Sequence, residues 1–437
     1  MPLDRRSLIL HAMMAGLGGC VGRARLPSRA DGWGTDRVTQ FRADIETYAA
    51  AGIKAAGGPG DRAVELWLER ELRASGYAVE RQSIDVPFFT TRQASLRCAT
   101  AEAVLFPQAI VVPTGPEGVS APLVRVDRAS YATADVAGAL VLVDLPAARW
   151  SSIEPLRAIL MHLFAHGAGA LILVTNGPTG GAIALNVDVV APPFPRPVAI
   201  LAPRDAAPFL QAAERHAPAT LILTGEGGYR RAHSLSARHR RARMGGGIIA
   251  VSTPKSGWFD CVGERGAGIA LWLALARWAA AEGNAGDFRF FANSGHEYGN
   301  AGMQNLLRTS APGVAVTQFW LHLGANVAAR DWADGPPALA PLPGVDPART
   351  LAVCDSLINP ARRLFAGQGG LEDPIIVDAR VAGELHELVM AGYTRVAGIF
   401  GAHRFHHLAE DDLRCAAPEA LPAIFDALRG LISAAQG

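Results

Sequence analysis

Hydrophobic and polar positions alternate along this chain in two patterns, one typical of strands and the other of helices. Residues 62–86 predict an amphipathic helix, a stop at Gly76 and a strand with apolar residues at alternate positions. Residues 245–280 predict a buried strand, a long glycine-rich loop and a strongly apolar helix, and residues 287–307 repeat that order. A further strand is expected over residues 316–326. Strands that alternate with helices predict an α/β fold with a mostly parallel, helix-covered sheet.

The remaining segments divide into regular and irregular parts. Residues 383–413 predict a helix, a strand and a histidine-rich loop, and residues 417–435 predict a closing helix. The arginine-rich stretch 229–246 is interpreted as a solvated connector, and the proline- and glycine-rich stretch 330–360 as irregular surface. Residues 105–226 predict short buried strands with two short helices, and they bring together no useful set of carboxylates or histidines.

A candidate site begins at the pair His296-Glu297. The pair follows an apolar run that ends at Asn293, where a strand is expected to give way to a helix. In α/β sheets the carboxyl ends of strands are where ligands and catalytic groups collect. The alternative is a helix amino terminus that carries an acid in its first turn without any chemistry.

Composition limits the classes of protein that this chain can belong to. A length of 437 residues favours two domains, and 50% hydrophobic with 19% charged residues describes a globular protein with a sizeable core. Because 41 Lys and Arg residues nearly balance 40 Asp and Glu residues, electrostatics give no reason to expect nucleic acid as a partner.

The first residues predict an export signal over residues 1–20. Arg5 and Arg6 precede a short apolar stretch that ends at Cys20, which resembles a bacterial lipobox and loosely a twin-arginine signal. We therefore expect an exported protein of the periplasm or cell envelope, with membrane contact only through a lipid on Cys20. The alternative is a plain cleaved signal peptide in which Cys20 is incidental.

The other four cysteines lack the paired spacing of a structural zinc site. They are Cys98, Cys261, Cys354 and Cys415. In an oxidising compartment they allow one or two disulfides, whose pairing the sequence does not define.

Three loops that follow predicted strands carry the candidate ligands. Glu264 lies in the first, His296 and Glu297 in the second, and His407 in the third. Strands of a parallel sheet bring such loops together, and two carboxylates with one imidazole suit Zn²⁺ with a position left for water. Bound zinc would make that water a nucleophile for acyl transfer. Asp260 is a fallback ligand from the first loop.

The order of these motifs resembles the zinc aminopeptidase family, whose relatives include glutamate carboxypeptidase, glutaminyl cyclase and the transferrin receptor. The resemblance implies a zinc-exopeptidase α/β domain in two pieces, 36–100 and 240–437, around a β-rich protease-associated domain at 105–226. Members of that family bind two zincs through five ligands and use a glutamate as general base. The implied substrate is a peptide or a small amide-containing molecule.

Two of the family's motifs keep a ligand in this chain. The Glu-Glu pair falls on His296 and Glu297, so the metal-binding glutamate is kept and His296 takes the place of the base. The late Tyr-His motif falls on His406 and His407, with the expected aspartate at Asp411. His406 is therefore a secondary candidate beside the ligand His407.

The other motifs depart from the pattern. The Asp-Asn loop falls on Glu264 and Arg265, which places a longer carboxylate at the bridging position. The His-x-Asp motif begins at Ser252, and the Asn-Leu-Asp motif runs from His322 to Gly324. Ser252 and Gly324 would both serve one zinc, so the resemblance implies at most one metal. His322 is a further secondary candidate.

Two other interpretations stay open. Since the transferrin receptor resembles the same scaffold and has no peptidase activity, a catalytically inactive binding protein is the alternative to a zinc-dependent hydrolase or acyl-transfer enzyme. Ser252 and Lys255 also match the S-x-x-K motif of serine acyl enzymes, but that motif needs a helix start where proline and glycine dominate here.

Overall fold

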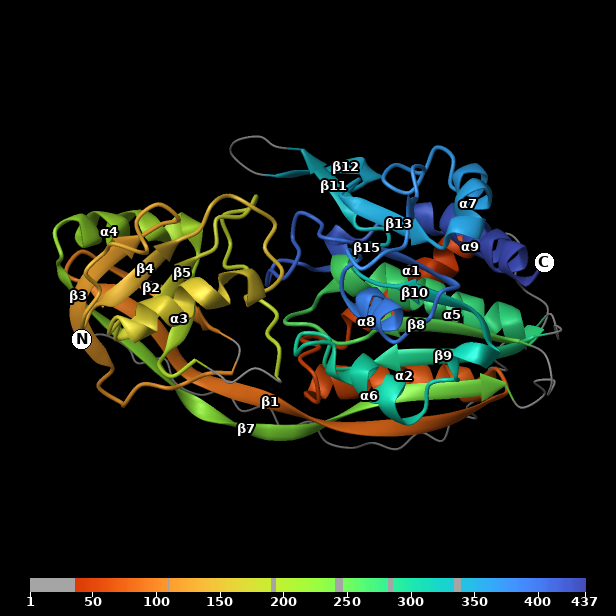
Figure 1. The fold of residues 1–437 in the computed structure, drawn as a ribbon, viewed down its shortest axis with the longest axis horizontal. Helices are drawn as coiled ribbons and strands as arrows, with labels where there is room; N and C mark the ends of the chain where they lie inside the picture. The colour runs from red at the N-terminus through yellow and green to blue at the C-terminus, as the bar shows by residue number, and fades with distance from the viewer. Residues whose placement is uncertain (1–35, 109, 190–193, 240–246, 282–285, 334–338) are drawn as a thin grey trace, which may run out of the picture. The chain divides into compact units, whose positions relative to one another are not determined.

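The computed structural model describes residues 36–108, 110–189, 194–239, 247–281, 286–333 and 339–437. Two very long strands run through this part of the chain. Strands β1 (Tyr77–Cys98) and β7 (Pro218–His239), of 22 residues each, pair antiparallel along almost their whole length. Together they form a ribbon with one group of strands attached at each end, as Figure 1 shows.

One group of strands forms the sheet that carries the candidate site. Strands β8 (Ile248–Pro254), β9 (Asp287–Asn293), β10 (Thr317–Leu323) and β15 (Val396–Gly401) are mutually parallel, in the order β9-β8-β10-β15. Strand β7 joins this sheet antiparallel at β9. The loops after the parallel strands therefore leave the sheet at the same edge, as the sequence predicted.

Helices cover both faces of this sheet. On one face α5 (Ala267–Ala281) contacts β8 and packs against α1 (Arg37–Ala49) and α9 (Leu421–Gln436). On the other face α6 (Ala301–Thr309) and α8 (Glu384–Met390) contact each other. Helix α5 is apolar on all sides because it is enclosed by these elements, and every residue from Ala267 to Ala276 is buried. The predicted helix-covered α/β sheet is confirmed.

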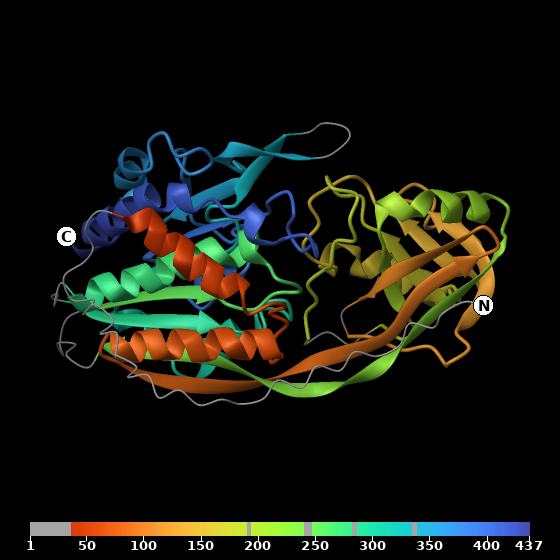
Figure 2. The same cartoon turned by 180° about the vertical axis from the view of Figure 1, so that it is seen from behind.

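Several further elements complete this part of the fold. They are α2 (Pro59–Ala74), β11 (Arg330–Ala333), β12 (Ala340–Val345), β13 (Arg349–Val353), α7 (Ile358–Leu364) and β14 (Ile375–Ile376). Strand β13 pairs antiparallel with β15, and α2 packs against the ribbon of β1 and β7. Figure 2 shows α1 and α2 from behind.

The second group of strands lies between β1 and β7 in the sequence, and we call it the inserted unit. Strands β3 (Val119–Val126), β4 (Leu140–Asp144), β5 (Ala170–Val174) and β6 (Val198–Leu201) run parallel, and β2 (Ala101–Pro107) pairs antiparallel with β6. Its helices are α3 (Arg157–Ala165) and α4 (Pro203–Glu214). Apolar side chains form a core on each face of these strands, and one of the two cores continues to Trp258, Tyr298 and Phe405 outside the inserted unit.

Two expectations about irregular segments were wrong. The arginine-rich stretch belongs to β7 as far as His239, where pairing with β1 satisfies its backbone, and residues 240–246 lie outside the described part. The stretch 330–360 contains β13, whose Leu351, Ala352 and Val353 are buried in the sheet. Proline and glycine are frequent on both sides of this strand but do not occur within it, so the composition of the whole stretch did not indicate a strand.

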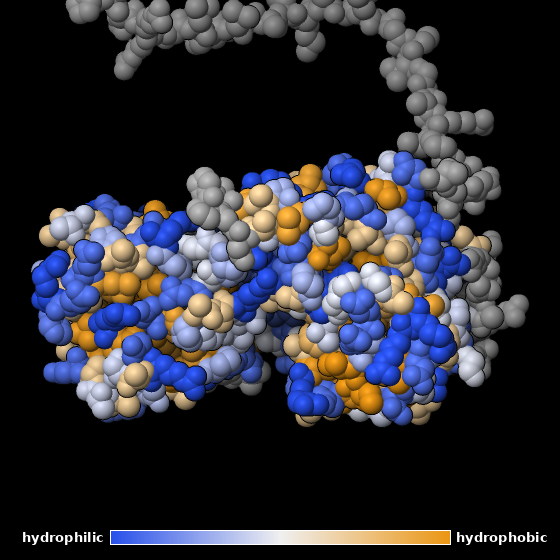
Figure 3. Space-filling view, turned by 90° about the horizontal axis from the view of Figure 1, so that it is seen from above, coloured by the Kyte–Doolittle hydropathy of each residue, from blue (hydrophilic) through white to orange (hydrophobic). Residues whose placement is uncertain are grey.

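The predicted signal segment, including Cys20, lies outside the described residues. Cys98, Cys261, Cys354 and Cys415 are free thiols, and burial raises the pKa of Cys261 and of Cys415. Within the described ranges, no helix has the length and apolar character needed to cross a bilayer. The face in Figure 3 shows hydrophilic residues interspersed with smaller apolar clusters.

Candidate functional site

A short π-helix positions Glu264. The helix η3 (Val262–Gly266) follows Cys261, whose backbone is left-handed with φ 40°, and it leads directly into α5. π-Helical turns inside helices are frequent at functional sites. Asp411 accepts hydrogen bonds from the backbone N–H groups of Gly263 (2.7 Å) and Glu264 (3.0 Å). The loop after β15 therefore fixes the turn that presents Glu264.

Only glycine fits at position 263. A Cβ atom on Gly263 would lie 2.7 Å from Asp411 Oδ1 and 2.8 Å from both Cys415 Cβ and His403 Cε1. His403 itself lies with Nε2 3.2 Å from Asp411 Oδ2. This close packing joins the Glu264 turn to the histidine-rich loop without space for a side chain between them.

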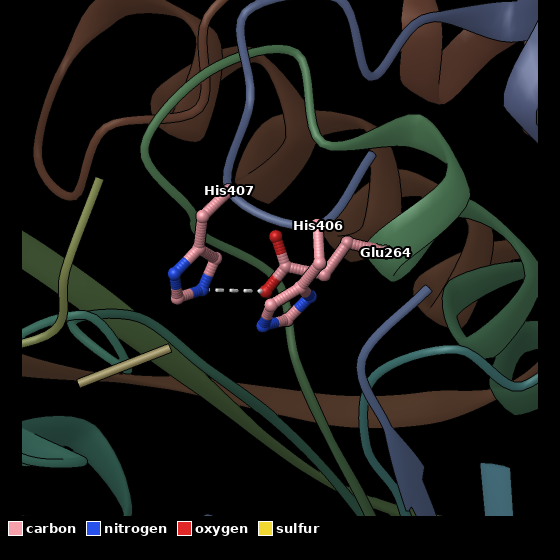
Figure 4. A group of neighbouring side chains, drawn as sticks. All are labelled: Glu264, His406 and His407. Carbon is pink, nitrogen blue, oxygen red and sulfur yellow. Dashed lines mark ion pairs between the residues drawn. The ribbon is translucent and has the colours of Figure 1, made fainter. Parts of the chain in front are cut away.

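The histidine-rich loop brings two imidazoles to Glu264. His407 Nε2 lies 3.4 Å from Glu264 Oε1, and the ring of His406 stacks on that of His407 with centroids 3.9 Å apart. Figure 4 shows the three side chains converging from η3 and from this loop. His407 has a left-handed backbone with φ 59°, a conformation that a non-glycine residue adopts at a cost. Strained positions of this kind cluster at functional sites.

These three residues form the candidate metal group. Within the described part of the chain, Glu264, His406 and His407 are the one set of His, Cys, Asp or Glu residues whose ligand atoms all lie within 4.8 Å of one another. All three side chains are buried. Glu264 Oε2 and His406 Nδ1 lack hydrogen-bond partners, whereas Glu264 Oε1 lies within ion-pair distance of Arg265 and His407. Buried polar atoms normally have partners, so these orphaned atoms fit a bound cation, and one carboxylate with two imidazoles suits zinc.

Arg265 modifies this group. Its Nη2 lies 2.6 Å from Glu264 Oε1, and both side chains are almost fully buried. Burial opposes ionisation of Glu264, but Arg265 and the two histidines more than offset it, so the pKa of this carboxyl lies well below its usual range. Glu264 is therefore a carboxylate before any metal binds. Oε1 takes the 2.6 Å contact with Arg265, and Oε2, which has no hydrogen-bond partner, is the oxygen that we expect to face a metal.

His296 forms a dyad with Glu384, the first residue of α8. His296 Nδ1 lies 3.6 Å from Glu384 Oε1, and Asn293 Nδ2 donates to Glu384 Oε2 at 2.9 Å. Burial lowers the pKa of His296, Arg265 lowers it further, and contact with Glu384 opposes both effects. The imidazole is thus neutral near neutral pH, as a general base must be.

The residues at the departed motifs form a polar cluster of their own. Ser252 Oγ is 3.0 Å from His322 Nδ1 and accepts a hydrogen bond from Trp320 Nε1 at 2.8 Å. Burial lowers the pKa of His322 to about 4, so this ring is neutral. Glu384 Oε2 lies 4.0 Å from His322 Nδ1, so the carboxylate that faces His296 also faces this ring. Within the described residues, His322 and Glu384 do not belong to a set of three potential ligands whose atoms all lie within 4.8 Å of one another.

The S-x-x-K alternative is wrong on this geometry. Ser252 lies in the middle of β8 rather than at a helix start. The amine of Lys255 forms a buried ion pair with Asp61 instead of facing Ser252. The lysine therefore cannot serve as the base for Ser252.

The structure places Glu297 and Asp260 outside the metal group. Glu297 Oε1 accepts from the backbone N–H of Ala56 at 2.9 Å, and Oε2 accepts from Ser256 Oγ at 2.7 Å. Burial raises the pKa of Glu297, although these hydrogen bonds oppose the shift. Asp260 contributes its backbone carbonyl to Lys54 Nζ at 2.8 Å. Their roles as metal ligands stay predictions.

Sequence reasoning missed Glu384. Its only local signal is an acid after Gly383 in the first turn of α8, a place where acids occur without any functional role. Glu384 and His296 are 88 positions apart in the sequence. Tertiary packing alone brings them together, so the spacing of residues along the chain does not predict their contact.

A separate cavity of about 290 Å³ lies in the inserted unit, away from these residues. Its lining is mainly apolar and includes Leu145, Trp150 and Ile159, with Asp127 and Arg128 among its polar members. None of the lining residues belongs to the metal group or to the dyad. This cavity and the candidate chemistry are thus in different places, and we base the function on the chemistry.

Comparisons with known proteins support the fold. No protein-family profile and no curated protein sequence matches this chain. Among solved structures, a zinc aminopeptidase from Bacillus subtilis matches 90% of this chain and 94% of its own, with TM-score 0.71 and 17% identity. A peptidase M28 precursor from Shewanella amazonensis matches 92% and 94%, with TM-score 0.70 and 16% identity.

A third match agrees with these two. An aminopeptidase from Aneurinibacillus sp. strain AM-1 matches 90% of this chain and 93% of its own, with TM-score 0.62 and 16% identity. All three similarities extend over nearly the full described length. The chain therefore has the fold of the zinc aminopeptidases, as its motif order predicted.

Proposed function

We propose that this protein is a hydrolase of peptide or other amide bonds that uses a single zinc ion. The observation that carries the proposal is the buried group of Glu264, His406 and His407, whose ligand atoms lie within 4.8 Å of one another and in which Glu264 Oε2 and His406 Nδ1 have no hydrogen-bond partner. Ser252 and Gly324 supply no ligand where the resemblance would place a second zinc, which favours one ion.

Each residue of the candidate site would have its own role in the reaction. Glu264, His406 and His407 would hold the zinc, which when bound supplies Lewis acidity toward the scissile carbonyl and lowers the pKa of water. His296 would act as the general base at Nε2, because its Nδ1 faces Glu384 Oε1 at 3.6 Å. Arg265 keeps Glu264 ionised, and burial of the whole group limits access of bulk water.

Metal analysis of the purified protein tests this proposal. We expect about one equivalent of zinc in the wild type and its loss in His407→Ala. His166→Ala is the matched control, because His166 is exposed on the inserted unit and lies outside the metal group. A wild-type protein that binds no zinc would refute the single-zinc proposal.

The role of His296 has its own test. Activity should be sought with aminoacyl, N-acyl and ester substrates. We expect His296→Ala to lower kcat by about 10²- to 10⁴-fold, the range that general acid–base catalysis contributes, while zinc content stays unchanged. Unchanged cleavage would remove His296 as the base.

A non-catalytic binding protein is the second candidate, and one observation favours it. The ion pair of 2.6 Å between Arg265 and Glu264 neutralises the carboxylate without any metal. This candidate predicts no bound zinc and no cleavage, but saturable binding of peptides to the wild type. The zinc measurement therefore separates the two candidates.

Export and membrane attachment extend the proposal. We infer that residues 1–20 direct export to the periplasm or cell envelope, with a lipid on Cys20, and that residues 105–226 act as a protease-associated domain. The lipobox-like sequence ending at Cys20 supports the first inference, and the strand-rich inserted unit supports the second. Mass spectrometry of the mature protein tests lipidation, which fails if the amino terminus is not a lipidated Cys20.

A further inference from the structure

The loop that carries His407 is held by the inserted unit as well as by its own sheet. We call residues 402–412 the His407 loop and residues 183–187 of the inserted unit the docking segment. Ala184, in the docking segment, accepts a hydrogen bond at its carbonyl from His407 Nδ1 at 2.9 Å. The N–H of Ala184 donates to the His407 carbonyl at 3.0 Å. The two residues are 223 positions apart in the sequence.

This contact selects the form of His407 that can bind metal. A ring that donates Nδ1–H to a carbonyl carries its lone pair on Nε2, and Nε2 is the atom 3.4 Å from Glu264 Oε1. The hydrogen bond from the Ala184 N–H to the His407 carbonyl also helps to hold His407 at φ 59°, a conformation that costs free energy in a non-glycine residue. The docking segment thus fixes both the tautomer and the backbone of a candidate ligand.

A buried glutamine of the inserted unit holds the docking segment through two hydrogen bonds. Gln108 is buried, its Nε2 donates to the Leu185 carbonyl at 2.6 Å, and its Oε1 accepts from the Leu185 N–H at 3.1 Å. The segment also reaches the other strand-end loop, since the N–H of Val187 donates to the Glu297 carbonyl at 3.1 Å. One short stretch of the inserted unit therefore contacts two loops of the candidate site.

A second attachment lies at the base of the His407 loop. Arg149 Nη1, from the inserted unit, donates to Asp346 Oδ2 at 2.9 Å and to the Ala402 carbonyl at 2.7 Å. Asp346 is fully buried and also accepts from the N–H of Arg404 at 3.0 Å. Arg149 therefore ties the inserted unit to the point where the loop leaves β15.

We propose that the inserted unit sets the zinc affinity of the site by positioning His407, with Arg149 and Gln108 as the positioning residues. This inference rests on the proposed single-zinc function. Neither residue touches the metal group, so both act through the backbone of the docking segment or of the His407 loop. Groups that orient metal ligands typically change metal affinity by about 10- to 100-fold when they are removed.

Zinc dissociation constants, measured by competition with a chromogenic chelator, test the proposal. We expect Arg149→Met and Gln108→Met each to weaken zinc binding by about 10- to 100-fold. Arg125→Met is the matched control, because Arg125 pairs with Asp144 inside the inserted unit at 3.0 Å and does not contact the His407 loop. Circular dichroism establishes whether each variant is folded. Because the two variants alter separate attachments, the proposal can still be tested if one of them misfolds.

The outcomes distinguish this inference from the proposed function. Wild-type protein that binds no zinc would overturn both. Zinc affinity that is unchanged in both folded variants, or equally weakened in Arg125→Met, would overturn the positioning role alone.

A second readout needs no metal. At a pH where the ring is neutral, ¹⁵N chemical shifts of His407 in the metal-free wild type, assigned with His407→Gln, should show the tautomer that carries its proton on Nδ1. In Arg149→Met and Gln108→Met we expect averaged shifts from a mixture of tautomers. A ring that keeps the wild-type shifts in both variants would contradict the proposal.

Discussion

The dyad of His296 and Glu384 makes a specific prediction about pH. His296 acts as a base only when it is unprotonated, so activity falls as the pH drops through its pKa. Burial and Arg265 lower that pKa, whereas Glu384 raises it. In Glu384→Gln the opposing carboxylate is gone, so the pKa should fall further and the acidic limb of kcat/KM should move to lower pH.

The rate itself should also fall in Glu384→Gln, because the ring loses the ionised partner that orients Nδ1. The pH profile of kcat/KM measures both effects. Glu387→Gln is the control on the same helix, since Glu387 accepts from Asn300 at 3.0 Å and not from His296. An acidic limb that stays in place in Glu384→Gln would show that the dyad does not set the protonation of the base.

Gly263 gives a prediction about stability. In Gly263→Ala the new Cβ would lie 2.7–2.8 Å from atoms of Asp411, Cys415 and His403, and all three atoms belong to buried side chains. Overpacking of this kind costs about 1–3 kcal/mol in the free energy of unfolding. Gly344→Ala should change it far less, because no atom lies within 4 Å of its added Cβ. Urea denaturation of both variants measures the difference, and equal midpoints would contradict the close packing.

At the level of single residues, the sequence predicted the parts of the site that strand ends bring together. Glu264 and His407 meet because the loops after parallel strands leave the sheet at one edge. Glu297 comes from the same edge, but Ser256 and the backbone of Ala56 supply donors that hold its carboxylate. Those donors come from separate segments, so only the assembled fold reveals the competition.

At the level of elements, a buried ion pair connects α2 to the end of β8. Lys255 and Asp61 are both buried, and Asp61 also accepts from Ser294 Oγ at 2.7 Å. Removing one partner of a buried pair leaves an uncompensated charge and costs about 3–5 kcal/mol. We therefore expect Lys255→Met to destabilise the protein by about this amount in chemical denaturation.

An exposed ion pair provides the comparison. Arg97 and Glu102 lie 2.9 Å apart with side chains 58% and 50% exposed, so Arg97→Met should cost no more than about 1 kcal/mol. A Lys255→Met variant as stable as Arg97→Met would show that Asp61 finds another partner or becomes protonated.

Local patterns predicted the regular elements well where hydrophobic periodicity was strong. The apolar helix α5 and the strands β8, β9 and β10 appear where the pattern indicated. The second half of β7 did not look like a strand, because Arg230 and Arg231 lie among few apolar residues. That half is a strand because β1 pairs with it residue by residue, so its structure comes from its partner rather than from its own sequence.

For the whole molecule, the decisive fact is that the candidate ligands come from distant segments and are held by a third. Glu264 and His407 belong to loops at the edge of one sheet, and Ala184 belongs to the inserted unit. The sequence indicated two separate bodies of structure, but it carried no signal for the backbone contact between them. Such a contact depends on the assembled surfaces, and a backbone hydrogen bond leaves no mark on residue type.

Zinc bound at this meeting point should therefore stabilise the folded protein as a whole. A ligand that binds only the native state adds RT ln(1 + [L]/Kd), which is about 2.7 kcal/mol at a free concentration of 100 Kd. We expect zinc to raise the unfolding free energy of the wild type by about this amount in denaturant titrations that include a thiol reductant.

Comparing the zinc-dependent increase in unfolding free energy between variants shows which residues bind the zinc. His407→Ala should unfold with the same midpoint whether or not zinc is present, whereas His166→Ala should retain the wild-type increase. Because Cys98, Cys261, Cys354 and Cys415 become accessible on unfolding, zinc binding to the unfolded chain would reduce the increase in every variant by a similar amount. An increase of wild-type size in His407→Ala would place the zinc elsewhere and remove the metal role of the histidine-rich loop.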